Sequence, residues 1–166
     1  MGLSKDLDRV TLQERELQFD KMDEQTAWEI GSRLRALAVE RGLSVVIDVR
    51  RFGQPLFYTA LQGTTPDNVE WVRRKGNAVV RFHRSSYGVG LHLKSKDDSI
   101  EARGLPTADY ASHGGSFPIT VKNAGIVGSI TVSGLPQRAD HELVVEALCS
   151  ILHRNYDELK LEPEQS

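Results

Sequence analysis

A cationic cluster lies in the middle of the chain and contains, in order, Trp71, Arg73, Arg74, Lys75 and Arg81. Residues seven apart project from the same face of an α-helix, so Arg74 and Arg81 should share a face with Lys75 close by. A partly buried arginine pair can bind a carboxylate or phosphate through paired hydrogen bonds. Two alternatives stay open. The cluster could be a solvent-exposed helix face, or a subunit interface formed by Trp71, Arg73 and Arg74, because tryptophan and arginine are enriched there.

A second candidate is a glycine-rich segment that carries an imidazole, His113 followed by Gly114 and Gly115. Paired glycines let the backbone approach a ligand closely and present its N–H groups. The His113 side chain could act there as a haem ligand or as a proton carrier, because imidazole coordinates metals and titrates near neutral pH. The alternative is a turn in which the glycines only satisfy backbone geometry and His113 faces solvent.

The third candidate is the pair Ser133 and Gly134, which ends an apolar run and precedes the expected last helix. A strand that leads into a helix presents backbone N–H groups at the helix N-terminus, where anions are favoured. Asp140 is placed to cap that helix with its own carboxylate, and we expect this structural role to prevail over ligand binding.

The histidines and the single cysteine predict no dedicated metal site. No pair has a recognised metal-ligand spacing among His83, His92, His113, His141 and His153. We therefore expect no metal, unless His113 coordinates the iron of a haem. Cys149 lies among apolar residues and is expected to be a buried core thiol, and a lone cysteine cannot form an intramolecular disulfide.

The elements that would position these residues alternate between helical and extended patterns. Helical spacing of apolar residues covers 7–19, as a short helix entering an extended piece, then 23–42, 67–84 and 140–152. Strand-like runs cover 43–49, 56–60, 117–121 and 125–133, and short turns join them as two hairpins. Residues 85–109 are weakly patterned and allow a short strand or an irregular helical turn. The pattern predicts an α+β domain, an antiparallel sheet flanked by helices.

Composition limits the class of protein. The 166 residues fit one domain, residues 1–166, with polar ends at about 1–8 and 162–166 expected to be loosely held. A net charge of −2 argues against a nucleic-acid-binding protein. No run approaches the roughly 20 apolar residues of a membrane helix, and the first ten residues are too charged for a signal peptide. We expect a cytoplasmic protein with no nucleic-acid or membrane partner.

Several spaced motifs together resemble a family of bacterial and fungal proteins, of the UPF type, grouped with the haem-degrading-domain superfamily that includes GlcG and HbpS. The resemblance spans residues 12–153 and rests on WVRRKGN (71–77), RF (81–82), SSY (85–87), HGGSFPI (113–119), VSGLPQ (132–137) and DH (140–141), with LF (56–57) and GT (63–64). It implies a profilin-like, GlcG/HbpS-like α+β fold that assembles into large homo-oligomers. Through the HbpS branch it also implies haem binding or degradation. The resemblance transfers no catalytic residues.

The favoured function is an oligomeric small-ligand-binding protein, with haem as the candidate cofactor. His113 would be the axial ligand, and Arg74 and Lys75 would bind the propionates. The full set of expected ligand-binding residues is Arg74, Lys75, Arg81, His113, Gly114, Gly115, Ser133 and Gly134.

Two other functions stay open. An enzyme acting on a small anionic metabolite would bind it through the same arginines and use His113 or His141 for proton transfer. An assembly or adaptor protein without catalysis would bury Trp71, Arg73 and Arg74 between chains. Both the binding protein and the enzyme require the cationic segment and the His113 loop to meet at one recess.

Overall fold

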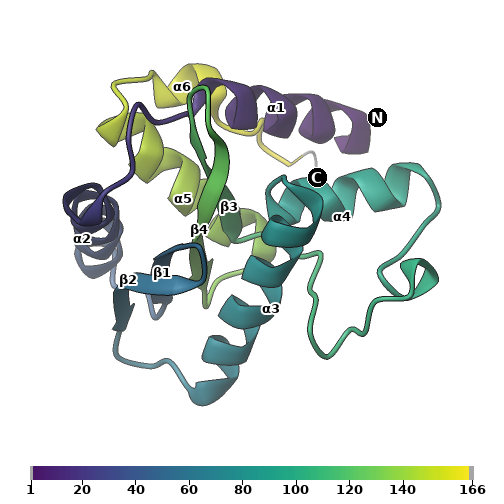
Figure 1. Cartoon of the computed structure of the whole chain (residues 1–166), viewed down its shortest axis with the longest axis horizontal. Coiled ribbons are helices and arrows are strands. Elements are labelled where there is room, and N and C mark those ends of the chain that lie inside the picture. Colours follow the sequence, from purple (N-terminus) through teal and green to yellow (C-terminus); the bar gives the residue numbers. More distant parts are fainter. Residues whose placement is uncertain (1, 165–166) are drawn as a thin grey trace.

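Helices cover both faces of a four-stranded antiparallel sheet in the computed structural model, which describes residues 2–164 (Figure 1). The strands are β1 (Val46–Arg51), β2 (Gln54–Ala60), β3 (Ser116–Val121) and β4 (Gly125–Ser133), in the spatial order β2-β1-β4-β3. The helices are α1 (Gly2–Glu16), α2 (Glu24–Glu40), α3 (Pro66–Phe82), α4 (Ser86–Ser95), α5 (Gln137–Ile151) and α6 (Tyr156–Leu159), with a 3₁₀ turn at Glu101–Arg103. The predicted α+β class and both predicted hairpins are confirmed.

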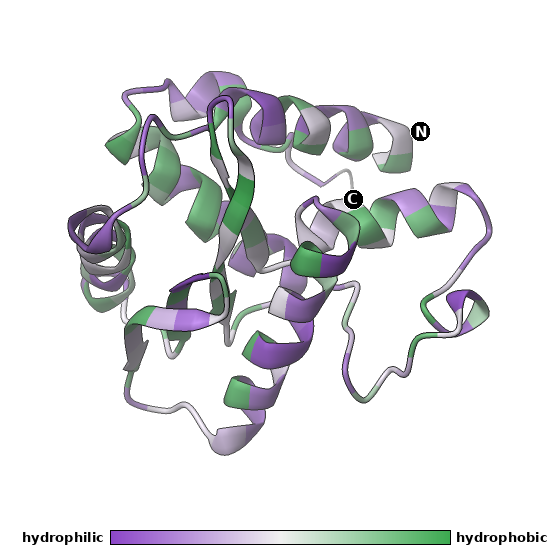
Figure 2. Ribbon diagram, viewed as in Figure 1, coloured by the Kyte–Doolittle hydropathy of each residue, from purple (hydrophilic) through white to green (hydrophobic). Residues whose placement is uncertain are grey.

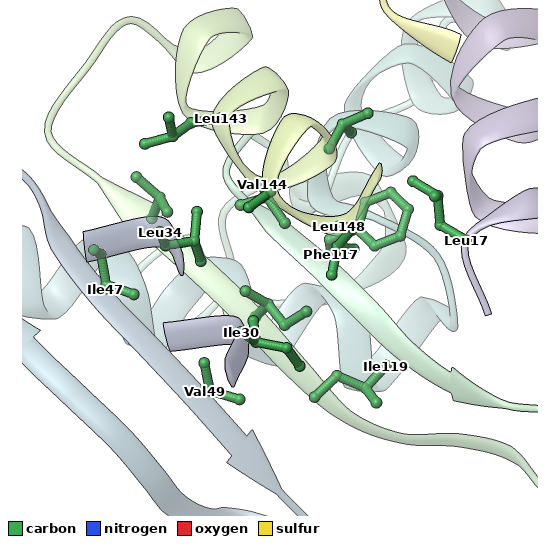
Figure 3. Packing of buried hydrophobic residues seen from close by; sticks show 14 of the residues in the cluster. Leu17, Ile30, Leu34, Ile47, Val49, Phe117, Ile119, Leu143, Val144 and Leu148 are labelled. Carbon is green, nitrogen blue, oxygen red and sulfur yellow. The ribbon is translucent and has the colours of Figure 1, made fainter. Parts of the chain in front are cut away.

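One face of the sheet is apolar and forms the main core. Successive side chains of a strand point to opposite faces, so β1 contributes Ile47 and Val49 to this face, and β4 contributes Ile130 and Val132. Helices α2 and α5 cover the face and bury these side chains completely (Figure 3). Figure 3 shows the residues of the two helices and the sheet meeting between them, including Ile30, Leu34, Phe117, Ile119, Val144 and Leu148.

The opposite face of the sheet is polar and lies under α3. The alternating positions of the same strands carry small or charged side chains, all at most 2% exposed: Asp48, Ser116, Ser129, Thr131 and Ser133. The hydroxyls of Ser116 and Thr131 lie 2.8 Å apart, which satisfies one buried polar pair. Figure 2 shows hydrophilic residues along much of α3, the helix that covers this face.

The sequence sets both ends of α3. Pro66 takes the first helical position, where its missing N–H has no partner to lose. The Thr65 N–H donates to the Asn68 side chain at 2.9 Å. The helix ends at His83, whose φ of 58° is left-handed and whose N–H donates to the Val79 carbonyl. The predicted helix over 67–84 is confirmed to within two residues.

Helix α4 corrects the expectation for residues 85–109. Ser86–Ser95 form a regular helix, and the Ser85 side chain caps it by accepting the Gly88 N–H at 3.0 Å. Six of its ten residues are buried, because α1, α3, α5 and β3 surround it. A helix buried on most sides lacks the apolar stripe that sequence patterns detect. Hence the alternation of Leu91 and Leu93 did not indicate a strand.

Helix α1 begins at Gly2, earlier than the predicted helix over 7–19. Leu3 and Leu7 pack against a small cluster formed by Val10, Tyr87 and neighbouring residues. Residues 2–8, which belong to the end expected to be loosely held, therefore form the first turns of α1. Residues 1, 165 and 166 of the two ends lie outside the described residues. No helix within 2–164 combines the length and apolarity needed to cross a bilayer.

Candidate functional site

One recess lies where the N-terminal half of α3, the loop before β3, and the β4–α5 junction meet. It has a volume of about 270 Å³. Its walls include Trp71, Lys75, His113, Ser133, Gly134 and Asp140. The structure thus brings the cationic segment and the His113 loop to the same place, although they are about forty residues apart in the chain.

Lys75 and Asp140 form a buried ion pair at the base of this recess. Their side chains are 4% and 2% exposed, and Lys75 Nζ lies 3.0 Å from Asp140 Oδ2. Lys75 also donates to the Val132 carbonyl at 3.2 Å, and Asp140 accepts the Leu135 N–H at 2.9 Å. Desolvation lowers the pKa of Lys75, although the carboxylate beside it opposes this shift. Lys75 is therefore engaged by the protein itself, and its ammonium does not face a ligand.

Asp140 corrects the expected start of the last helix. Helix α5 begins at Gln137 after Pro136, so Asp140 lies inside the first turn instead of at the N-cap. Its carboxylate turns back to the Leu135 N–H and to Lys75. Asp140 thus has a structural role, but the role is to link α5 to Lys75 of α3 and to the segment that follows β4.

The glycines of the site allow close backbone packing. A Cβ at Gly114 would lie 2.3 Å from the Gln137 carbonyl oxygen, and one at Gly134 would lie 2.1 Å from the Ser44 carbonyl oxygen. Gly115 has a φ of 139°, and its Cβ would collide with the Val132 oxygen and with the Lys75 ammonium. The Gly114 N–H donates to the Gln137 side chain at 2.9 Å. These glycines hold the loop against β4 and α5 and thereby place His113.

His113 is the exposed imidazole of the recess. Its ring meets the Trp71 ring edge-on, with centroids 5.4 Å apart. No residue in 2–164 forms a hydrogen bond with either ring nitrogen. Partial burial, and then the positive charges of Lys75, Arg74 and Lys94, lower the pKa of His113. This shift favours the neutral form of the ring, and a neutral imidazole has the free lone pair that coordinates metals.

Arg74 lies beside His113 and carries an uncompensated charge. Its guanidinium stacks over the Trp71 ring at 4.5 Å from the centroid, and its Nε donates to the Thr107 carbonyl at 2.8 Å. Within the described part of the chain no carboxylate forms an ion pair with it. Arg73 differs, because Glu70 and Asp109 both pair with it, at 3.2 and 3.0 Å.

His113 and Arg74 also line a second recess, of about 230 Å³. Apolar side chains such as Leu91 form part of its wall, and Lys94 adds another cation. Lys94 was not among the predicted site residues, because nothing in the weak pattern of residues 85–109 indicated that α4 would lie beside the His113 loop.

Arg81 lies apart from this site, although it follows Arg74 by two helical turns. Seven residues of α-helix span about 10 Å along the axis, and neither recess at His113 is lined by Arg81. Arg81 lines a different groove, between α3 and the sheet. The sequence placed Arg74 and Arg81 in one ligand-binding set, whereas in the structure they line different cavities.

His141 and Cys149 lie in the interior. Burial lowers the pKa of His141 to about 3, and its Nε2 lies 2.7 Å from the Gln13 side-chain oxygen. The enzyme hypothesis therefore loses one of its two candidate proton carriers, since His141 reaches neither recess. Cys149 is 1% exposed, as expected of a core thiol, and burial raises the pKa of its thiol to about 11.

Comparison with known proteins gives matches over nearly the whole chain. The family described as "Haem degrading protein HbpS-like" matches residues 22–149. A UPF0303 protein of Acidobacterium capsulatum is 61% identical over 162 residues, covering 97% of this chain and 98% of the relative. A UPF0303 protein of Burkholderia thailandensis is 56% identical over the same length and coverage.

Solved structures share the fold. The crystal structure of the Ybr137w protein aligns with a TM-score of 0.81 at 28% identity, covering 89% of this chain and 87% of that one. HbpS aligns with a TM-score of 0.64 at 20% identity, covering 81% and 92%. A PduOC:haem complex aligns with a TM-score of 0.66 at 11% identity, covering 78% and 94%. The expected GlcG/HbpS-like fold is confirmed.

Proposed function

This chain belongs to the HbpS-like haem-degrading family, and from that premise we propose that it binds haem, with His113 as the axial ligand of the iron. The observation that carries the proposal is the exposed, neutral imidazole of His113, whose ring nitrogens have no partner within residues 2–164. A structural neighbour, PduOC, has been crystallised as a haem complex, which supports this ligand for the fold.

The residues around His113 are chemically suited to binding haem. Arg74 and Lys94 are cations that line the recess beside the imidazole, and either can bind a propionate, whereas Asp98 and Glu101 place carboxylates elsewhere in the same lining. Lys75, which the sequence suggested for this role, instead neutralises Asp140. Haem would supply a redox-active iron at this site. The protein supplies the imidazole, its orientation by Trp71 and the loop glycines, and the cations.

We also propose that a second copy of the chain covers the haem. The recess of about 270 Å³ is smaller than the roughly 300–1,000 Å³ of cavities that enclose drug-sized ligands. A macrocycle bound to His113 would therefore project from one chain and expose an apolar edge. Self-association would bury that edge, and it would bring the half-buried Trp71 into a subunit interface.

Titration with hemin tests the proposal. We expect saturable binding with a shifted Soret band, and loss of that shift in His113→Ala. His92→Ala is the matched control, because His92 lies on α4 and lines neither recess. An unchanged Soret band in His113→Ala would remove His113 from the proposal, and absence of saturable binding to the unmodified protein would contradict haem binding.

Analytical ultracentrifugation of the same samples tests self-association. We expect an oligomer whose sedimentation coefficient rises or holds when hemin is added. A monomer in both states would contradict the role of a second copy while leaving the role of His113 to the titration.

A further inference from the structure

A groove on the polar face of the sheet is larger than the recess at His113. It runs between α3 and strands β1 and β4, and its volume is about 670 Å³. That volume lies within the roughly 300–1,000 Å³ typical of small-molecule sites. Neither the proposed haem site nor the main core uses this groove.

Small residues leave the groove open beneath α3. Gly76 faces the sheet, and a Cβ built there would lie 3.7 Å from the Ser129 hydroxyl and 3.9 Å from the Thr131 hydroxyl. Helix and strand therefore meet through a glycine and short polar side chains, whereas branched apolar residues fill the other face. The groove is open because the side chains at Gly76, Ser129 and Thr131 are small.

The floor of the groove offers an unused hydrogen-bonding group. Ser129 is 1% exposed and lines the groove, yet its hydroxyl forms no hydrogen bond with any residue in 2–164. Thr131 beside it is already paired with Ser116. Within residues 2–164 the only fully buried side-chain atom without a hydrogen-bond partner is His141 Nδ1, so the Ser129 hydroxyl is open to water or to a ligand in the groove.

The charges of the groove favour an anion. Arg50 forms two hydrogen bonds with the buried Asp48, at 2.8 and 2.7 Å, so this pair is neutral overall. Arg73 is neutralised by Glu70 and Asp109. Arg81 also lines the groove, and it has no ion pair within the described residues. Of the three arginines that line the groove, Arg81 alone has no carboxylate partner within residues 2–164, so it is the cation available to an anionic ligand.

The rim of the groove is apolar and exposed. Phe52, at the turn between β1 and β2, is 79% exposed, and Val80 on α3 is 62% exposed. Val72 forms a buried part of the same wall. Exposed apolar side chains next to a cavity are typical of binding sites, because a ligand removes them from water.

We propose that this groove is a second ligand site, for a small amphipathic anion. The acidic group of the ligand binds Arg81, and its aromatic or branched body packs between Phe52 and the valines of α3. The Ser129 hydroxyl bonds a polar atom at the inner end. The site is separate from the recess at Trp71 and Lys75, because the two share no lining residue, and only Tyr110 also lines the recess that contains Arg74 and Lys94.

Fluorescence titration with anilinonaphthalene sulfonate, an aromatic anion, tests the proposal. We expect saturable binding at one site per chain. Arg81→Gln should raise Kd at least about tenfold, as expected for loss of a charge-assisted hydrogen bond. Gly76→Leu, which places a side chain in the groove, should abolish the fluorescence increase. Circular dichroism confirms that each variant is folded.

Arg35→Gln is the matched control, because Arg35 is an exposed helical arginine on α2 that lines neither recess nor groove. Equal weakening by Arg35→Gln and Arg81→Gln would reduce the effect to net charge and overturn the proposal. Affinity unchanged in both Arg81→Gln and Gly76→Leu would also overturn it. Loss of binding in His113→Ala alone would assign the probe to the haem recess and would likewise overturn it.

Discussion

The two faces of the sheet are built from alternate residues of the same strands, yet they differ in almost every physical property. On the face covered by α2 and α5, branched and aromatic side chains interlock without access to water. On the face covered by α3, hydroxyls and a buried carboxylate replace them, and a groove remains. Both recesses beside His113 and the larger groove border α3 or the elements packed on it. The apolar face supplies stability, which allows the polar face to carry sites.

Among the predicted substitutions, one on the apolar face of the sheet should lower the free energy of unfolding the most. Phe117→Ala removes a ring that is 1% exposed in the main core. Such a truncation leaves a cavity and should lower the free energy of unfolding by about 4 kcal/mol. Urea unfolding followed by circular dichroism measures it. A loss below about 1 kcal/mol would show that the core can collapse around the site.

On the polar face, substitution of the buried ion pair between Lys75 and Asp140 should lower the free energy of unfolding the most. Lys75→Met leaves the Asp140 carboxylate buried without its cation, which should cost about 3 kcal/mol. The double variant Lys75→Met/Asp140→Leu removes both charges and should recover much of the loss, because no unpaired charge remains buried. A double variant as unstable as the single one would mean that the pair stabilises the fold through its hydrogen bonds to β4 and the loop.

Acid should weaken the fold through His141. Its pKa is about 3 in the folded protein, against 6.5 for an ordinary histidine, so the unfolded chain binds this proton first. Stability should therefore fall as pH decreases below about 6.5, approaching 1.4 kcal/mol per pH unit. His141→Gln, which cannot titrate, should flatten the dependence. Urea midpoints from pH 7 to about 4 in both proteins measure the difference, and parallel curves would contradict it.

A substitution at the floor of the groove should change the free energy of unfolding the least. Ser129→Ala removes a hydroxyl that has no partner within residues 2–164, so the free energy of unfolding should change by less than about 0.5 kcal/mol. Val132→Ala, on the same strand but the other face, should cost several times more. Similar losses at both positions would mean that the two faces of the sheet contribute equally to stability.

Much of the fold was predictable because the relevant signals are local. The strand-like runs at 43–49 and 125–133, the apolar spacing of the helix at 67–84 and the hairpin turns depend on neighbouring residues only. The family resemblance rested on the same stretches, and the comparisons confirmed it. Helix α4 escaped prediction because burial on most sides erased its pattern.

For the candidate site, the sequence determined which side chains exist and that Trp71, Lys75 and His113 belong to elements able to meet. Only the tertiary structure decided what each side chain does. It paired Lys75 with Asp140, placed Lys94 beside His113, buried His141, and separated Arg81 from Arg74 by the length of two helical turns. The physical reason is that charge compensation and solvent access depend on residues distant in the chain, which no local spacing can reveal.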